Sequence, residues 1–210
     1  GIETVQSDSG IFLCQKKYVQ EVLGRFGMLD CNPVTTPAEK GVKLTKESNG
    51  RGVDSTLYKQ IVGSLMYLTA TRPDIMQAVS MISRYMETPK ENHLLAAKRI
   101  LRYLKGTCDF GVFYKRGEAP DLFGFRDSEY GGDLDDRKST SGYAFIFGSA
   151  AVSWCSKKQP IVTLSTTEAE FVAAAVCTCQ ALWLRNILEE LQCKQKDASL
   201  IFCDNSSTIK

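Results

Sequence analysis

The spacing of apolar residues changes near the middle of the 210-residue chain. Before residue 110, apolar positions recur every three or four residues, which predicts helices over residues 57–69, 74–86 and 92–105. Near the start, IETVQ and IFLCQ flank the turn sequence SDSG, which predicts a β-hairpin. A further helix is predicted within KKYVQEVLGRFGM, followed by a proline-containing loop. The first half is therefore expected to be mainly helical.

After residue 110 the pattern is that of short strands. FGVFYK, DLFGFRD, GYAFIFG and AVSWCSK are rich in aromatic and β-branched residues and are separated by turn residues. An apolar helix is predicted over residues 167–191, and the strand sequence LIFCD follows it. We place the boundary after residue 117, so that residues 118–210 have the order β-β-β-α-β. This order predicts the α/β class, with a mixed sheet covered by helices.

The composition is ordinary for a globular protein, with 43% hydrophobic and 24% charged residues. No run of about 18 uncharged apolar residues occurs, so we predict no membrane span. The N-terminus lacks the basic and apolar regions of a signal peptide and has no initiator Met, which favours an internal part of a longer, intracellular protein. The eight cysteines contain no CxxC pair and are expected to be reduced and buried.

Positive charge is concentrated in the first half of the chain. Residues 1–118 hold 17 Lys and Arg against 12 Asp and Glu, and the remaining residues hold 9 against 12. Several of these cations lie close together on the helix predicted over residues 92–105. They are Lys98, Arg99, Arg102 and Lys105. Such a group is either a solvated helix surface or a contact with the phosphates of a nucleic acid, and the spacing leaves both interpretations open.

Three carboxylates occupy comparable positions in the second half. Asp127 follows the apolar run LFGF and Arg126, Asp204 follows the apolar run LIFC, and Glu170 opens the long apolar helix. Strand ends and helix starts can present groups at one edge of a sheet, where three carboxylates would repel one another without a cation between them. Mg²⁺ suits that position because it prefers oxygen ligands. Two such ions about 4 Å apart can support phosphodiester hydrolysis.

Structural roles are the alternative for these acids. In STTEAE, both Glu168 and Glu170 lie three residues after a hydroxyl residue and fit a capping box. Asp127 and Asp204 also suit turns that follow strands. Other chemistry has less support, because the chain has no P-loop, GxGxxG or GxSxG motif. The single histidine, His93, is expected on the surface near a helix start.

Several long segments resemble one known family. DLDDRKSTSGYAFIFGSAAVSWCSKKQPIVTLSTTEAEFVAAA resembles the ribonuclease H region of copia-type (Ty1/copia) retrotransposon Pol polyproteins. YVQEVLGRFGMLDCNPVTTP, TLYKQIVGSLMYLTATRPDI and AAKRILRYLKGT resemble the same polyproteins just after the reverse transcriptase palm. The resemblance covers essentially the whole chain. It implies a reverse transcriptase thumb/connection-like region over residues 1–117 and a ribonuclease H-like domain over residues 118–210.

The resemblance also implies an activity and its residues. The family cleaves the RNA strand of RNA–DNA hybrids with Mg²⁺, for which Mn²⁺ can substitute. Asp127, Glu170 and Asp204 match its catalytic, metal-binding acids, which leaves Glu168 as the better capping residue. The implied partners are hybrid or template–primer nucleic acid, with the basic helix as a contact, and the rest of the Pol polyprotein. The implied location is the cytoplasm, within a virus-like particle, or the nucleus.

Two departures from the family pattern stand out. Glu129 occupies a position where the family has a second aspartate, two residues after Asp127. The chain also ends at residue 210, where the family continues with further helices, another strand and a fourth metal ligand, and the polymerase palm is absent. The domain is therefore expected to be truncated at its C-terminus. A second hypothesis follows: the chain is a catalytically incomplete remnant that only binds nucleic acid.

Overall fold

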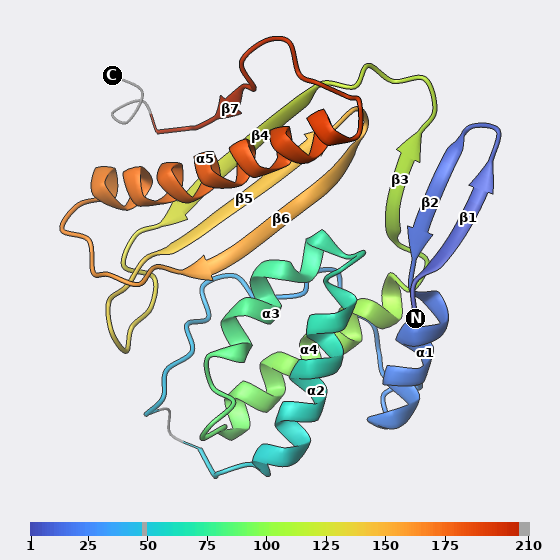
Figure 1. Cartoon of the computed structure of the whole chain (residues 1–210). Coiled ribbons are helices and arrows are strands. Elements are labelled where there is room, and N and C mark those ends of the chain that lie inside the picture. Colours follow the sequence, from blue (N-terminus) through green and yellow to red (C-terminus); the bar gives the residue numbers. More distant parts are fainter. Residues whose placement is uncertain (48–49, 206–210) are drawn as a thin grey trace. The chain divides into compact units, whose positions relative to one another are not determined.

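The computed structural model describes residues 1–47 and 50–205 and divides the chain into two compact units (Figure 1). Unit 1 comprises residues 1–7 and 11–113, and unit 2 comprises residues 8–10 and the chain from residue 114 onward. Each unit has its own cluster of buried hydrophobic side chains.

Helices form most of the regular secondary structure of unit 1, as the three-to-four-residue spacing predicts. The four α-helices are α1 (Lys16–Arg25), α2 (Ser55–Leu68), α3 (Met76–Ser83) and α4 (Glu91–Gly106). A three-stranded sheet has the order β1 (Glu3–Ser7), β2 (Gly10–Cys14) and β3 (Gly111–Lys115). The helix predicted over residues 74–86 is in fact a 3₁₀ turn, η1 (Pro73–Ile75), followed by the shorter α3. The predicted hairpin is confirmed.

A buried arginine connects η1 to the end of α4. Arg72 is 1% exposed, and its Nε donates to Asp74 Oδ1 at 2.9 Å. Its Nη1 donates to the carbonyl oxygen of Thr107 at 2.8 Å, and the hydroxyl of Tyr103 donates to Asp74 Oδ2 at 2.9 Å. Because a buried charge is tolerated only when it is paired and hydrogen-bonded, this network accounts for an arginine in the core of unit 1.

His93 is fully buried, so the surface position expected from the sequence is wrong. Its Nδ1 accepts a hydrogen bond from the backbone N–H of Lys90 at 3.0 Å, and its Nε2 lies 3.0 Å from the carbonyl oxygen of Thr45. Its ring stacks on Tyr85 with the ring centroids 4.0 Å apart. His93 therefore occupies the third position of α4 and bonds back to the residue before the helix, as Glu does in a capping box.

Unit 2 contains a four-stranded mixed sheet with one long helix on it (Figure 1). Its elements are β4 (Leu122–Glu129), β5 (Thr140–Phe147), β6 (Ala150–Lys158), α5 (Thr166–Glu190) and β7 (Ile201–Phe202). The strand order is β6-β5-β4-β7, in which β4 pairs antiparallel with β5 and parallel with β7. The predicted α/β architecture with a mixed sheet and the order β-β-β-α-β is confirmed, although β7 is shorter than predicted.

Small residues bring α5 close to the sheet. The buried side of this helix consists of Ala169, Glu170, Ala173, Cys177, Ala181 and Leu184. Phe145 on β5 fills the space beneath it and is 0% exposed. A Cβ on Gly124, its partner on β4, would lie 2.6 Å from Phe145 Cε1, so this position requires glycine.

The opposite side of α5 is also apolar and exposed. Its large hydrophobic side chains are Phe171, Val176, Leu182, Trp183 and Ile187, which are 40–58% exposed. Among the residues that the structure describes, α5 is the one helix that is long and apolar enough to cross a membrane, although its uncharged run, residues 171–184, is shorter than the run of about 18 sought in the sequence. Core helices of globular proteins meet the same criterion, and α5 lies against the sheet.

All eight cysteines are free, as the absence of paired motifs predicts. Cys14 and Cys177 are buried, and burial raises the pKa of the Cys177 thiol to about 11. Cys179 and Cys193 are exposed and the other four are partly buried, so the expectation that the thiols are buried holds only for Cys14 and Cys177.

Candidate metal centre

Three carboxylates converge in unit 2. Asp127 on β4, Glu170 on α5 and Asp204 after β7 each place one carboxylate oxygen within 4.8 Å of the other two. Glu170 is buried, whereas Asp127 and Asp204 are exposed. Within residues 1–47 and 50–205, no other group of three or more His, Cys, Asp or Glu side chains comes together in this way. The structure therefore gathers the three acids that the sequence singled out.

The register of β4 and β7 explains why the two aspartates are neighbours. Phe125 pairs with Phe202 in the parallel ladder, and their rings stack with centroids 5.2 Å apart. Asp127 and Asp204 each lie two residues further along the chain. Since side chains two residues apart point to the same side of a strand, the pairing of the phenylalanines places the two aspartates next to each other.

The start of α5 separates the roles of the two glutamates in STTEAE. Ser165 is the residue before the helix, and its Oγ accepts a hydrogen bond from the backbone N–H of Glu168 at 3.1 Å. Glu168 Oε2 in turn accepts one from the backbone N–H of Leu164 at 2.6 Å. Glu168 is thus the capping residue, as expected, and Glu170 faces the sheet.

Two residues of β4 hold the carboxylate of Glu170. Arg126 Nη1 donates to Glu170 Oε2 and also to the Glu170 carbonyl oxygen, the latter at 2.9 Å. Ser128 Oγ donates to Glu170 Oε1 at 2.9 Å. The side chains of Arg126 and Glu170 are both 6% exposed, so this is a buried ion pair. Arg126 and Ser128 flank Asp127 in β4, so the strand that holds Glu170 also carries a second member of the three-carboxylate group.

Gln159 fastens the first turn of α5 next to Glu170. It is 3% exposed, and its Nε2 donates to the carbonyl oxygen of Ala169 and to Ser141 Oγ, both at 2.9 Å. The side chain therefore connects β5 to the backbone immediately before Glu170. Such support fixes the position of a carboxylate that would otherwise depend on its own side-chain rotamer.

Sequence reasoning missed Arg126, Ser128 and Gln159. A signal for Arg126 exists in the alternation of β4, because Leu122 and Gly124 occupy the buried side and Arg126 continues the same series. A charged residue at an inward position requires a buried partner of opposite charge. No comparable pattern marks Gln159, whose partners lie on another strand and on the backbone of α5.

Glu129 and Asp133 follow Asp127 in the sequence but do not belong to the three-carboxylate group. Glu129 is exposed, is not part of the three-carboxylate group, and packs over Gly132, where an added Cβ would lie 2.5 Å from its carboxyl carbon. Burial would raise the pKa of Asp133, but hydrogen bonds from Lys158 Nζ and from the backbone N–H of Asp135 outweigh it and lower the pKa to about 2. Asp133 thereby fastens the connection between β4 and β5 to β6.

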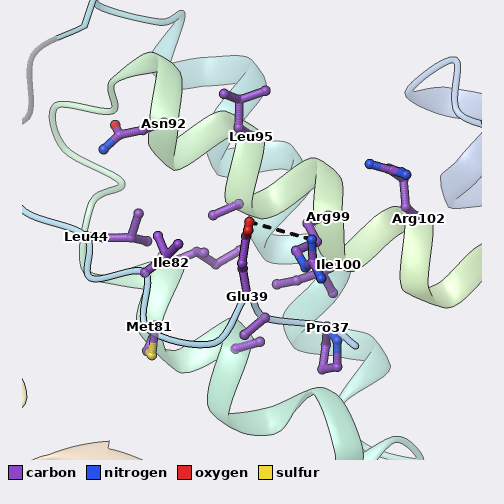
Figure 2. A pocket seen from close by; sticks show the side chains of 14 residues that line it. Pro37, Glu39, Leu44, Met81, Ile82, Asn92, Leu95, Arg99, Ile100 and Arg102 are labelled. Atoms are coloured by element: carbon purple, nitrogen blue, oxygen red, sulfur yellow. Dashed lines mark ion pairs between the residues drawn. The ribbon is translucent and has the colours of Figure 1, made fainter. Parts of the chain in front are cut away.

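The arginines of α4 hold a neighbouring segment of unit 1. Arg102 Nε donates to the carbonyl oxygen of Asn32 at 2.7 Å, and Arg99 Nη2 donates to Thr36 Oγ1 at 3.0 Å. Arg99 Nη1 also lies 3.7 Å from Glu39 Oε2 (Figure 2). These two cations, predicted to bind nucleic acid, already have partners within the protein.

The two lysines of the same helix differ from the arginines. Lys98 and Lys105 are exposed, and within the part of the chain that the structure describes neither forms an ion pair. These two lysines can therefore contact an external anion without breaking an internal contact. Nucleic-acid binding by α4 stays a prediction.

A groove of about 340 Å³ lies where the segment after residue 36 crosses α3 and α4 (Figure 2). Its walls include Leu44, Ile82 and Ile100, and the pair formed by Glu39 and Arg99 bridges it. Most of the side chains that line the groove are apolar, so the groove is accounted for by the docking of this segment on the two helices.

Comparison with known proteins identifies relatives over nearly the whole chain, although no family model and no solved structure matches it. The Retrovirus-related Pol polyprotein from transposon RE1 of Arabidopsis thaliana is 42% identical over 205 residues, which cover 98% of this chain and 14% of the relative. The corresponding polyprotein from transposon TNT 1-94 of Nicotiana tabacum is 42% identical over 206 residues, covering 95% and 15%. The Uncharacterized mitochondrial protein AtMg00810 of Arabidopsis thaliana is 38% identical over 184 residues, covering 87% and 76%.

The chain belongs to the Pol polyproteins of copia-type retrotransposons. The family predicted from the sequence motifs is confirmed. The chain corresponds to about one seventh of the length of the two transposon polyproteins and to about three quarters of the mitochondrial relative.

Proposed function

We propose that unit 2 is a ribonuclease H-like domain that hydrolyses the RNA strand of RNA–DNA hybrids with divalent cations bound by Asp127, Glu170 and Asp204. The observation that carries this proposal is the convergence of the three carboxylates, within 4.8 Å, from β4, α5 and the segment after β7. Membership of the copia-type Pol family supports it, because such polyproteins belong to elements that copy RNA into DNA.

The donor set fits magnesium. All three ligands are carboxylates, and Mg²⁺ prefers oxygen ligands and keeps several waters in its shell. Asp127 and Asp204 are exposed, which leaves one side open to water and to a substrate phosphate. When bound, Mg²⁺ would activate the attacking water and stabilise the departing 3′ oxygen. Carboxylate and water ligands also suit Mn²⁺.

The residues around the acids act by positioning. Ser128 fixes one oxygen of Glu170, and Gln159 fixes the backbone beside it, so this carboxylate points to one place before substrate arrives. Asp127 and Asp204 are set by the pairing of their strands. Unit 1 is proposed as the thumb/connection-like region, where Lys98 and Lys105 would contact phosphates electrostatically. The 2′-hydroxyl of RNA would help to distinguish it from DNA.

A hybrid-cleavage assay tests this proposal. The purified chain is incubated with a hybrid labelled on its RNA strand, in Mg²⁺ and separately in Mn²⁺. We expect cleavage by the wild type and by Glu129→Gln, a matched control that removes a neighbouring exposed carboxylate. We expect none by Asp127→Asn. Equal cleavage by wild type and Asp127→Asn would contradict the assignment.

The alternative of a non-catalytic binding protein predicts a different pattern. Under this alternative, the chain cleaves no hybrid with either metal ion but binds hybrid, and the binding weakens as the salt concentration is raised. Replacing both Lys98 and Lys105 by Ala would weaken that binding, whereas Asp127→Asn would not. The exposed pair of lysines on α4 is the feature that favours such binding.

A further inference from the structure

We infer that Arg126 lowers the affinity of the three-carboxylate group for divalent cations, because its buried guanidinium is bonded to the carboxylate of Glu170. The inference rests on the proposed function, because it concerns the same site. Arg126 would not bind the cation itself. It would position Glu170 and lower the affinity of the site for the cation.

The contacts of Arg126 place a fixed positive charge beside the metal ligands. Its Nη1 donates both to Oε2 and to the carbonyl oxygen of Glu170. The other carboxylate oxygen, Oε1, already accepts a hydrogen bond from Ser128 at 2.9 Å. Both oxygens of the one buried ligand are thus engaged by the protein, whereas Asp127 and Asp204 remain exposed.

Burial makes this charge effective. The side chain of Arg126 is 6% exposed, so water and salt screen it little. A divalent cation that binds Glu170 must either displace Nη1 from Oε2 or bind beside it, and both alternatives weaken cation binding.

The second contact of Arg126 limits how far it can move. Its bond to the Glu170 carbonyl oxygen, at 2.9 Å, ties the guanidinium to the backbone of α5. If a cation takes Oε2, Arg126 can keep this bond and remain near the site. The wild-type chain is therefore expected to require more divalent cation than a variant with a neutral residue at position 126.

Isothermal titration with Mn²⁺ tests the inference on three proteins. Arg126→Gln removes the charge and keeps an N–H donor for Glu170, and Arg126→Lys keeps the charge. We expect Arg126→Gln to bind Mn²⁺ about tenfold or more tightly than the wild type, and Arg126→Lys to bind within about threefold of it. The gain should disappear in Arg126→Gln combined with Glu170→Gln, because the inference requires the freed carboxylate.

Thermal unfolding provides a second readout. Without metal, Arg126→Gln leaves Glu170 buried without its cation and should unfold at a lower temperature than the wild type. Added Mn²⁺ should raise its unfolding temperature by more than it raises that of the wild type. If the variant is unfolded without metal, refolding on addition of Mn²⁺ supports the inference, and failure to refold overturns it.

The outcomes separate this inference from the proposed function. If Arg126→Gln binds Mn²⁺ no more tightly than the wild type, while Asp127→Asn weakens binding in both, the role of Arg126 is wrong and the metal site stands. If Asp127→Asn and Glu170→Gln leave Mn²⁺ binding unchanged, or no protein of the series binds Mn²⁺, the metal site itself is wrong.

Discussion

Asp127 and Asp204 are brought side by side by the parallel pairing of Phe125 with Phe202, since each aspartate lies two residues beyond its paired phenylalanine. This relationship makes the short strand β7 part of the proposed metal centre. A shift of β7 by one residue would turn Asp204 to the other side of the strand and separate the two carboxylates.

Removing one exposed aspartate should not destabilise unit 2 in the absence of metal. Coulomb repulsion between neighbouring carboxylates in water is about 1 kcal/mol at 4 Å, so Asp204→Asn should leave the free energy of unfolding unchanged or raise it by up to this amount. Added Mg²⁺ should stabilise the wild type and not the variant. Urea denaturation followed by tryptophan fluorescence measures this, because both tryptophans, Trp154 and Trp183, lie in unit 2. A large loss of stability without metal would show that Asp204 has a structural role instead.

The two glutamates at the start of α5 should differ in their contribution to stability. Glu170→Ala leaves Arg126 buried without its partner and should cost about 3–5 kcal/mol. Glu168→Ala removes one exposed capping contact and should cost about 1 kcal/mol. The same denaturation measurement compares them. Similar losses for both variants would contradict the division of roles between capping and the metal site.

Asp133 should make the stability of unit 2 depend on acid pH. Its pKa is about 2 in the folded protein, against an ordinary value of 3.8. Because the pKa of Asp133 is lower in the folded than in the unfolded protein, its charge stabilises the folded state at pH values above the unfolded pKa. This contribution, about 2 kcal/mol, is therefore present at pH 7 and is lost as the pH falls from about 4 towards 2.

Asp133→Asn tests this dependence when its free energy of unfolding is followed across pH. The difference from wild type should be about 2 kcal/mol at pH 7 and should disappear near pH 2. Asp121→Asn, which removes an exposed acid from the same unit, should change stability by less than about 0.5 kcal/mol at either pH. A difference for Asp133→Asn that does not shrink with acid would contradict the role of its charge.

The cations of α4 should separate into two classes. Replacing Lys98 and Lys105 by Ala should weaken hybrid binding, reduce its salt dependence by about one unit of slope per lysine, and leave unit 1 intact. Replacing Arg99 and Arg102 by Ala should instead release the segment that contains Thr36 and increase its cleavage by proteases.

Fluorescence anisotropy with a labelled hybrid, together with limited proteolysis, distinguishes the two classes of cation. Arginine variants that bind hybrid more weakly, with unchanged protease resistance, would show that these residues contact nucleic acid directly.

Local sequence patterns predicted much of this fold and site. The change of periodicity near residue 110 separated helices from strands, and apolar runs followed by acids located Asp127 and Asp204. The capping motif, with the family resemblance, distinguished Glu168 from Glu170. These features are visible because each depends on neighbours close in the sequence.

The remaining features depend on contacts between distant segments. The sequence predicts a surface position for His93, because its contacts with Thr45 and Tyr85 depend on the fold. The ion pair between Arg126 and Glu170 could not be predicted, because it depends on the packing of α5 on β4. Gln159 carries no pattern, because its partners are a backbone carbonyl oxygen and a serine on another strand. Spacing along the chain does not encode such pairs.

Locating the cation tests the proposed metal centre most directly. Crystals of the chain grown with Mn²⁺ and measured at the manganese absorption edge would give an anomalous difference map. A peak is expected between Asp127, Glu170 and Asp204, within coordination distance of a carboxylate oxygen of each. No peak at this position, with Arg126 still bonded to Glu170 and Mn²⁺ bound elsewhere or not at all, would contradict it.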